Sequence, residues 1–280
     1  MPLTERESAE VAAANASGKP TVAFIHGLWL LAGSWGDWRT YFEDQGYATI
    51  APGWPDDPET TAEANENPEV FADKGVGEIT DHLAEVLGGL NERPILIGHS
   101  FGGLLVQKLA GMSLAKITVA IDPAPFRGVL PLPFSALKAS FPVLKNPANK
   151  HKATKLTYEQ FRYAFANVVS EEEAHELYEK YSVAGSGVPL FEAASANLNP
   201  HTDASVDTKN PDRGPLLILD GDNDHTVPWA IANSEYKKYK DETDPTEIIK
   251  VENRGHSLTI DSGWKEVADI SLKFIKENGG

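Results

Sequence analysis

Short apolar runs alternate with longer amphipathic stretches along most of this chain. The apolar runs cover residues 21–26, 47–51, 94–98, 116–122, 215–220 and 247–251. Helical patterns cover residues 76–90, 101–111, 228–240 and 263–277. Several of the apolar runs are continuous rather than alternating, which is typical of strands buried on both faces of a parallel sheet. The pattern therefore predicts an α/β fold with a mostly parallel central sheet flanked by helices.

The segment 123–212 interrupts this alternation. It begins with a proline-rich stretch, continues with a helical pattern at 157–181 and ends in turn-forming residues, with no apolar strand pattern. Insertions between the strands of such sheets lie near the strand ends where ligands bind. We therefore expect residues 1–122 and 213–280 to form the core and residues 123–212 to form an inserted helical cap. The alternative is a surface elaboration with no role at the site.

Composition and charge exclude several other functions. The 280 residues suit one large α/β domain, and 25 Lys and Arg against 41 Asp and Glu give a net charge of −16. With no basic stripe evident, nucleic-acid binding is not expected. The absence of cysteine excludes disulfides, thiolate metal sites and a cysteine nucleophile. Because neither a secretory leader nor a run of about 20 apolar residues occurs, we expect a cytoplasmic protein without a membrane span.

The strongest chemical motif is Gly-His-Ser-Phe-Gly at residues 98–102. It follows an apolar strand and begins a helix, which is the context of a nucleophile elbow, so Ser100 is the candidate nucleophile. A serine hydroxyl needs a general base. His256 is the candidate base, because it lies in the loop between the last predicted strand and the last predicted helix.

The base in turn needs a carboxylate that orients it. Asp224 follows the strand 215–220 and is the first candidate. Asp122, at the end of the strand 116–122, is the main alternative, and Asp220 and Asp222 are neighbouring candidates. The order of serine, aspartate and histidine along the chain is the order expected on this type of sheet.

Two backbone N–H groups are expected to form an oxyanion hole. The N–H of Phe101 follows the nucleophile at the start of a helix, where backbone donors are free. The N–H of Leu28 follows the turn His26–Gly27 after the first strand, where the glycine permits a close approach of the backbone. The alternative is a tight turn with a packed histidine.

Together, these motifs resemble those of the α/β-hydrolase superfamily of serine esterases, lipases and cofactor-free perhydrolases. The resemblance covers residues 21–276 and rests on FIHGLW, GHSFGG, DGDNDHTVP and RGHS, in that order. It implies an α/β-hydrolase fold and the family's roles for the nucleophile, acid, base and oxyanion donors named above. It implies neither a cofactor nor a metal. The three-glycine oxyanion loop of one esterase branch is not present, since the chain has only the pair HG.

The expected reaction is acyl transfer through an acyl-enzyme, with a carboxylic ester or a lactone as the small-molecule substrate. Trp29, Leu30 and Phe126 are candidate substrate contacts, which would favour small to medium, largely apolar substrates. Further aromatic and aliphatic candidates for the pocket wall are Leu31, Trp35, Phe134 and Phe141. The alternative is that these side chains only pack the insertion onto the sheet.

Three other functions stay open. They are a cofactor-free perhydrolase or haloperoxidase-like enzyme, a C–C bond hydrolase, and a ligand-binding module that retains the fold with little turnover. The sequence does not predict the leaving group, the acyl-chain preference, the motion of the cap or the oligomeric state.

Overall fold

Six strands form the central sheet of the computed structural model, which describes residues 2–239 and 244–280. The strands are β1 (Thr21–Ile25), β2 (Ala48–Ile50), β3 (Ile95–His99), β4 (Ile117–Ile121), β7 (Leu216–Gly221) and β8 (Thr246–Val251). They lie in the order β2-β1-β3-β4-β7-β8, and every neighbouring pair is parallel. The strands predicted from the apolar runs are therefore confirmed.

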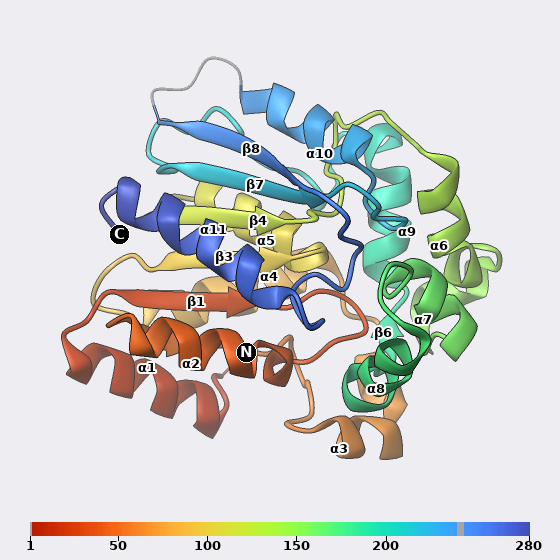
Figure 1. The fold of residues 1–280 in the computed structure, drawn as a ribbon, viewed down its shortest axis with the longest axis horizontal. Helices are drawn as coiled ribbons and strands as arrows, with labels where there is room; N and C mark the ends of the chain where they lie inside the picture. The colour runs from red at the N-terminus through yellow and green to blue at the C-terminus, as the bar shows by residue number, and fades with distance from the viewer. Residues whose placement is uncertain (1, 240–243) are drawn as a thin grey trace.

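Helices cover both faces of this sheet (Figure 1). One face packs against α4 (Val76–Gly88), α5 (Phe101–Gly111) and α10 (Trp229–Tyr236), and the other against α2 (Gly36–Asp44) and α11 (Trp264–Glu277). Alternate residues of a strand supply the two cores: in β7, Leu216 and Ile218 belong to the first, and Leu217 and Leu219 to the second. This two-sided burial explains the continuous apolar runs.

Several shorter elements complete the core. Helix α1 (Glu5–Ser17) contacts β2 and α4, and α3 (Thr61–Glu66) follows β2. Short 3₁₀ helices occupy Ala32–Trp35, Pro68–Phe71, Pro147–His151, Ala196–Leu198 and Lys237–Tyr239. The helix predicted at 228–240 is confirmed as α10 and the following 3₁₀ turn, while its last residue lies outside the described residues. No helix of the described chain is long and apolar enough to cross a bilayer.

The segment between β4 and β7 supplies four helices beside the carboxyl ends of the strands (Figure 1). They are α6 (Phe134–Leu144), α7 (Tyr158–Ala164), α8 (Glu171–Tyr181) and α9 (Val188–Ser195). The expectation that this segment contains no strand is wrong, because β5 (Ala153–Thr154) pairs with β6 (Gly185–Ser186) in a separate antiparallel sheet. Strands of two residues are too short to show an apolar pattern.

Candidate active site

The turn between β3 and α5 holds Ser100 in a conformation that few residues adopt. Its φ is +57° and its ψ is −121°, and the neighbouring glycines make this turn possible. A Cβ on Gly98 would lie 2.2 Å from the carbonyl oxygen of Gly102. A Cβ on Gly102 would lie 2.1 Å from the carbonyl oxygen of Ile25. The glycines thus let the elbow close tightly against β1, with the serine at its tip.

His256, in the loop after β8, forms a buried pair with Asp224. The His256 Nδ1–H donates to Asp224 Oδ2 over 2.6 Å, and neither side chain is exposed to solvent. Asp224 Oδ1 in turn accepts the backbone N–H groups of Thr226 and Val227, at 2.6 and 3.0 Å. Burial raises the pKa of the Asp224 carboxyl, and these backbone donors oppose the rise.

The state of the His256 ring follows from its surroundings. Burial lowers the pKa of His256 to about 4, so the ring is neutral at neutral pH. With the proton on Nδ1 directed to Asp224, the lone pair lies on Nε2. Within the described chain Nε2 is buried and has no hydrogen-bond partner. The ring is therefore in the tautomer that a general base requires.

A second carboxyl, that of Asp122, lies near the Nδ1 atom of the same ring. Asp122 ends β4, and its Oδ1 accepts the N–H of Gly221 over 2.8 Å. Its Oδ2 is 3.6 Å from His256 Nδ1, which is too long for a hydrogen bond. Burial, and then the negative charge of Asp224, raise the pKa of Asp122 well above its usual range. The distances therefore favour Asp224 as the acid that orients the histidine.

The other two candidate acids are placed differently. Asp220 is fully buried, and its burial, followed by the charges of Asp122 and Asp224, raises its pKa to about 10. Asp222 is exposed, and its carboxylate accepts a hydrogen bond from the side chain of Asn223. Neither carboxyl forms a hydrogen bond with His256 in the described chain.

The residue before Ser100, His99, contacts the ring of His256. The ring centroids of His99 and His256 are 4.6 Å apart, and Ser100 is the next residue in the chain. No hydrogen bond between Ser100 Oγ and His256 Nε2 is present among the described residues. In ligand-free enzymes such bonds are often long and shorten when substrate binds.

The turn after β1 lies directly against the elbow. A Cβ on Gly27 would lie 2.8 Å from the Cβ of Ser100 and 3.3 Å from the backbone nitrogen of Phe101. His26 fixes this turn: its Nε2 lies 2.9 Å from a carboxylate oxygen of Asp57, and its Nδ1 lies 2.9 Å from the carbonyl oxygen of Gly27. No sequence signal predicted the role of Asp57, because it lies 31 residues further along the chain.

The two backbone donors predicted from the sequence flank this contact. Phe101 is the first residue of α5, where the N–H has no partner within the helix. Leu28 follows Gly27, and the next residue, Trp29, has a φ of +65° that turns the chain away from the sheet. The Phe101 nitrogen therefore lies where the elbow meets the turn that leads into Leu28.

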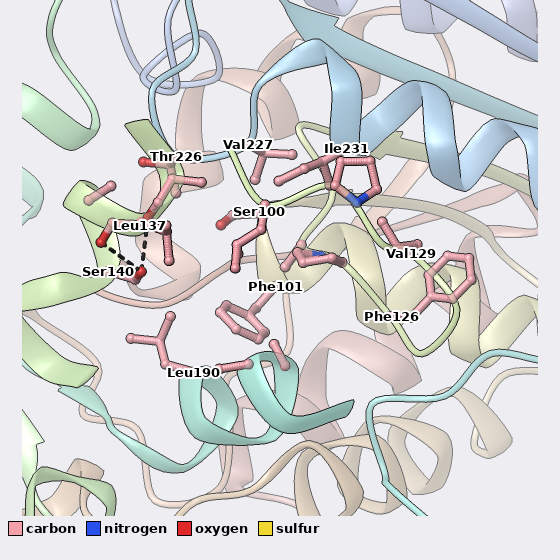
Figure 2. Close-up of a pocket in the computed structure, with 18 of the residues that line it drawn as sticks. Ser100, Phe101, Phe126, Val129, Leu137, Ser140, Leu190, Thr226, Val227 and Ile231 are labelled. Carbon is pink, nitrogen blue, oxygen red and sulfur yellow. Dashed lines mark hydrogen bonds between the residues drawn. The ribbon is translucent and has the colours of Figure 1, made fainter. Parts of the chain in front are cut away.

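Ser100 lines a cavity of about 210 Å³ between the sheet and the inserted helices (Figure 2). Of the predicted substrate contacts, Trp29 and Phe126 line this cavity. Leu30 does not, because its side chain is buried in the core. Most of the remaining wall was not predicted; it comes from the insertion and α10 and includes Val129, Leu137, Leu190, Val227 and Ile231.

The other aromatic candidates for the pocket wall do not line this cavity. Trp35 lies on the opposite face of the sheet, against Phe24 and Trp38. Phe134 and Phe141 are 80% and 61% exposed. The expectation that these side chains line the pocket is therefore not met.

One cluster in the described chain could also ligate a metal ion. His99, Asp122 and His256 each offer one ligand atom, and these atoms lie within 4.8 Å of one another. Burial, and then the charge of His256, lower the pKa of His99 well below its usual value. The hydrogen bond from His256 to Asp224 instead favours use of the cluster in acid–base chemistry.

Known structures share this architecture. A monoacylglycerol lipase from Paleococcus ferrophilus is 19% identical, with 94% of this chain and 97% of that chain covered and a TM-score of 0.64. A methylesterase from Arabidopsis is 13% identical, with 92% and 99% covered and a TM-score of 0.65. An extracellular alpha/beta-hydrolase from a Paenibacillus species is 19% identical, with 91% and 98% covered and a TM-score of 0.62.

Sequence comparison defines the family. A search of curated protein sequences finds no match. The model of the alpha/beta hydrolase family, however, matches residues 22–270, which is most of the chain. The protein therefore belongs to the alpha/beta hydrolase family.

Proposed function

We propose that this protein is a serine hydrolase that cleaves carboxylic esters, lactones included, of small to medium, largely apolar substrates. The observation that carries the proposal is the position of Ser100 on a tight elbow at an apolar cavity, directly after His99, whose ring contacts the His256 of the buried His256–Asp224 pair. In this proposal Ser100 is the nucleophile, His256 the general base and Asp224 the residue that orients the base.

The proposed reaction proceeds in two halves. His256 Nε2 takes the Ser100 hydroxyl proton as Oγ bonds to the substrate carbonyl carbon, and the Leu28 and Phe101 N–H groups stabilise the resulting oxyanion. When the bond to the leaving alcohol breaks, the imidazolium returns the proton to the departing oxygen. Water then attacks the acyl-enzyme carbonyl as His256 Nε2 takes its proton, and the ring returns that proton to Ser100 Oγ as the bond to the acyl group breaks and the acid leaves.

The cavity supports the proposed substrate class. Its wall is mainly aliphatic and aromatic, with few polar groups near Ser100. Its volume of about 210 Å³ is below the roughly 300–1,000 Å³ of sites for drug-sized ligands. We therefore expect esters with short acyl chains to react faster than esters with long ones. We also propose that residues 123–212 act as a cap, since α6 and α9 supply much of the wall.

The test is hydrolysis of a panel of p-nitrophenyl esters and lactones by the wild type and by Ser100→Ala. We expect the variant to lose at least about 10³-fold in kcat/KM. Ser140→Ala is the matched control, because Ser140 lines the same cavity but its hydroxyl donates to the Ala136 carbonyl of its own helix. Activity that persists in Ser100→Ala, or a folded wild type inactive on the whole panel, would contradict the proposal.

A further inference from the structure

Exposed apolar side chains gather at the mouth of the Ser100 cavity. In the described chain, most of the large exposed hydrophobic side chains lie between residues 130 and 141. Phe134 is 80% exposed, Leu130 76% and Phe141 61%. Isolated exposed apolar side chains are ordinary, but a contiguous group of them marks a contact surface. This group therefore needs a partner that buries it.

Most of the group lies on one face of helix α6, and its other members, Leu130 and Leu132, lie just before the helix. Phe134, Leu137 and Phe141 are spaced by three and four residues, so they lie on one side of the helix. Leu130, Leu132 and Leu137 are exposed and also line the cavity. Figure 2 shows Leu137 at the wall that α6 contributes. A partner that covers this face would therefore lie across the entrance to Ser100.

The same segment carries a charge opposite to that of the molecule. Between residues 123 and 158 there is no Asp or Glu, although the chain as a whole has a net charge of −16. The cations of this segment are too widely spaced to form a run, so the prediction that the sequence has no basic stripe is not tested by them. The charged residues of the segment are Arg127, Lys138, Lys145, Lys150, Lys152 and Lys155.

Two of these lysines belong to the apolar face itself. Lys138 and Lys145 are exposed, and they lie four residues after Phe134 and Phe141, on the same side of α6. The Lys138 ammonium also lies over the Tyr163 ring, 3.9 Å from its centroid. Apolar side chains flanked by lysines suit an anionic lipid surface. The rings and aliphatic chains enter the acyl boundary, and each lysine near the headgroups contributes about 1 kcal/mol. Repulsion from the acidic remainder of the protein is screened beyond about 8–10 Å at physiological salt.

A second copy of the chain fits this face less well. In a symmetric dimer, this face of α6 in one copy would pack against the same face of α6 in the other copy. The lysines of both copies would then lie close to one another, without acidic residues from this segment to pair with them. Charge complementarity therefore favours a lipid surface over self-association.

We propose that the α6 face, formed by Phe134, Leu137, Lys138, Phe141 and Lys145, docks the entrance of the Ser100 cavity onto an anionic lipid surface. The proposal concerns binding and does not depend on ester hydrolysis. It places the apolar cavity next to a reservoir of apolar molecules.

The test is co-sedimentation of the full chain with two kinds of vesicle. One is pure phosphatidylcholine, and the other contains about 30 mol% phosphatidylglycerol to supply a negative surface potential. We expect binding to the anionic vesicles only, and its loss at about 0.5 M NaCl, where charges are screened. Binding should weaken at least about tenfold in Phe134→Ser/Phe141→Ser and in Lys138→Glu/Lys145→Glu.

Matched controls separate this surface from general effects. Met112→Ser removes an exposed apolar side chain after α5, and Lys273→Glu reverses an exposed charge on α11; both should bind as the wild type does. None of the substituted residues lines the cavity, so all variants should hydrolyse a water-soluble ester at the wild-type rate if they are folded.

Three results would overturn the docking proposal. They are failure of the wild type to bind either vesicle, equal binding of the wild type and both double variants, and a dimer that Phe134→Ser/Phe141→Ser abolishes while no vesicle binding occurs. None of these three results would change the outcome of the ester assay. The docking proposal and the ester-hydrolysis proposal can therefore be contradicted independently of each other.

Discussion

At the scale of single residues, two buried carboxyls lie within 4 Å of His256 Nδ1. Asp224 accepts its hydrogen bond at 2.6 Å, whereas Asp122 lies at 3.6 Å and is bonded to the Gly221 N–H. We therefore expect Asp224→Asn to lower kcat/KM by about 10³–10⁴-fold, because an amide favours the wrong tautomer of the histidine. Asp122→Asn, the matched variant, should cost less than about tenfold.

The measurement is kcat/KM on the best ester of the panel, with folding checked by circular dichroism. The reverse ranking of the two variants would assign the acid to the end of β4 instead. The sequence alone left this choice open, since both residues follow strands of the same sheet. Only the distances in the folded chain separate them.

The pH dependence of the reaction follows from the same site. Burial lowers the pKa of His256 to about 4 in the free protein. Because only the neutral ring can accept the serine proton, the part of the kcat/KM profile that reports His256 should lie near pH 4, below the part that reports Asp224, whose pKa burial raises to about 7. The profile of a soluble ester, corrected for unfolding, measures this. An inflection near the ordinary histidine value of about 6.5 that persists in Asp224→Asn, where the aspartate can no longer titrate, would contradict it.

At the scale of elements, the elbow depends on a close contact between α5 and β1. Gly102→Ala would place a Cβ 2.1 Å from the Ile25 carbonyl oxygen, and that backbone cannot move without disturbing the sheet. We expect the free energy of unfolding to fall by about 3 kcal/mol or more. Gly88→Ala, in α4, meets no atom within 4 Å and should change stability by no more than about 1 kcal/mol, in the stabilising direction.

Urea unfolding of the two variants beside the wild type makes this comparison. Equal stabilities for Gly102→Ala and the wild type would mean that β1 and α5 can separate at little cost. That result would also remove the steric reason for a glycine at this position.

The elements that sequence reasoning recovered are those with local signals. The strands β3, β4 and β7 are buried along their whole length, and β3 and α5 flank a motif that specifies its own turn. The strands β5 and β6 were missed because Ala153 pairs with Ser186 across a long stretch of chain. Likewise, Leu30 and Trp35 were assigned to the pocket wall by their closeness to the turn after β1, but the fold buries both in the core.

At the scale of the whole molecule, α1 is joined to the core by a buried hydrogen bond between two titratable side chains that no motif predicted. Glu7 on α1 and His82 on α4 are 2% and 4% exposed, and Glu7 Oε1 lies 3.0 Å from His82 Nε2. The Thr4 N–H donates to the other carboxylate oxygen over 2.9 Å. Burial acts to raise the pKa of Glu7, but the hydrogen bonds from His82 and Thr4 outweigh it and hold the pKa at about 2.

This depressed pKa predicts a specific loss of stability in acid. The unfolded chain has a Glu7 pKa near 4.5, so the contribution of the ionised group is complete above that pH and disappears as the pH falls towards about 2. We therefore expect Glu7→Gln to lower the free energy of unfolding by about 1–3 kcal/mol at pH 7. The difference from the wild type should shrink at pH 3.5.

Urea unfolding at both pH values measures the difference, with Glu277→Gln as the control. Glu277 is exposed on α11 and lies 3.9 Å from Lys273, so its substitution should change stability by less than about 0.5 kcal/mol at either pH. A Glu7→Gln difference of the same size at pH 7 and 3.5 would show that packing, rather than charge, joins α1 to α4. A difference confined to pH 7 would make the Glu7–His82 pair a pH-sensitive attachment of the N-terminal helix.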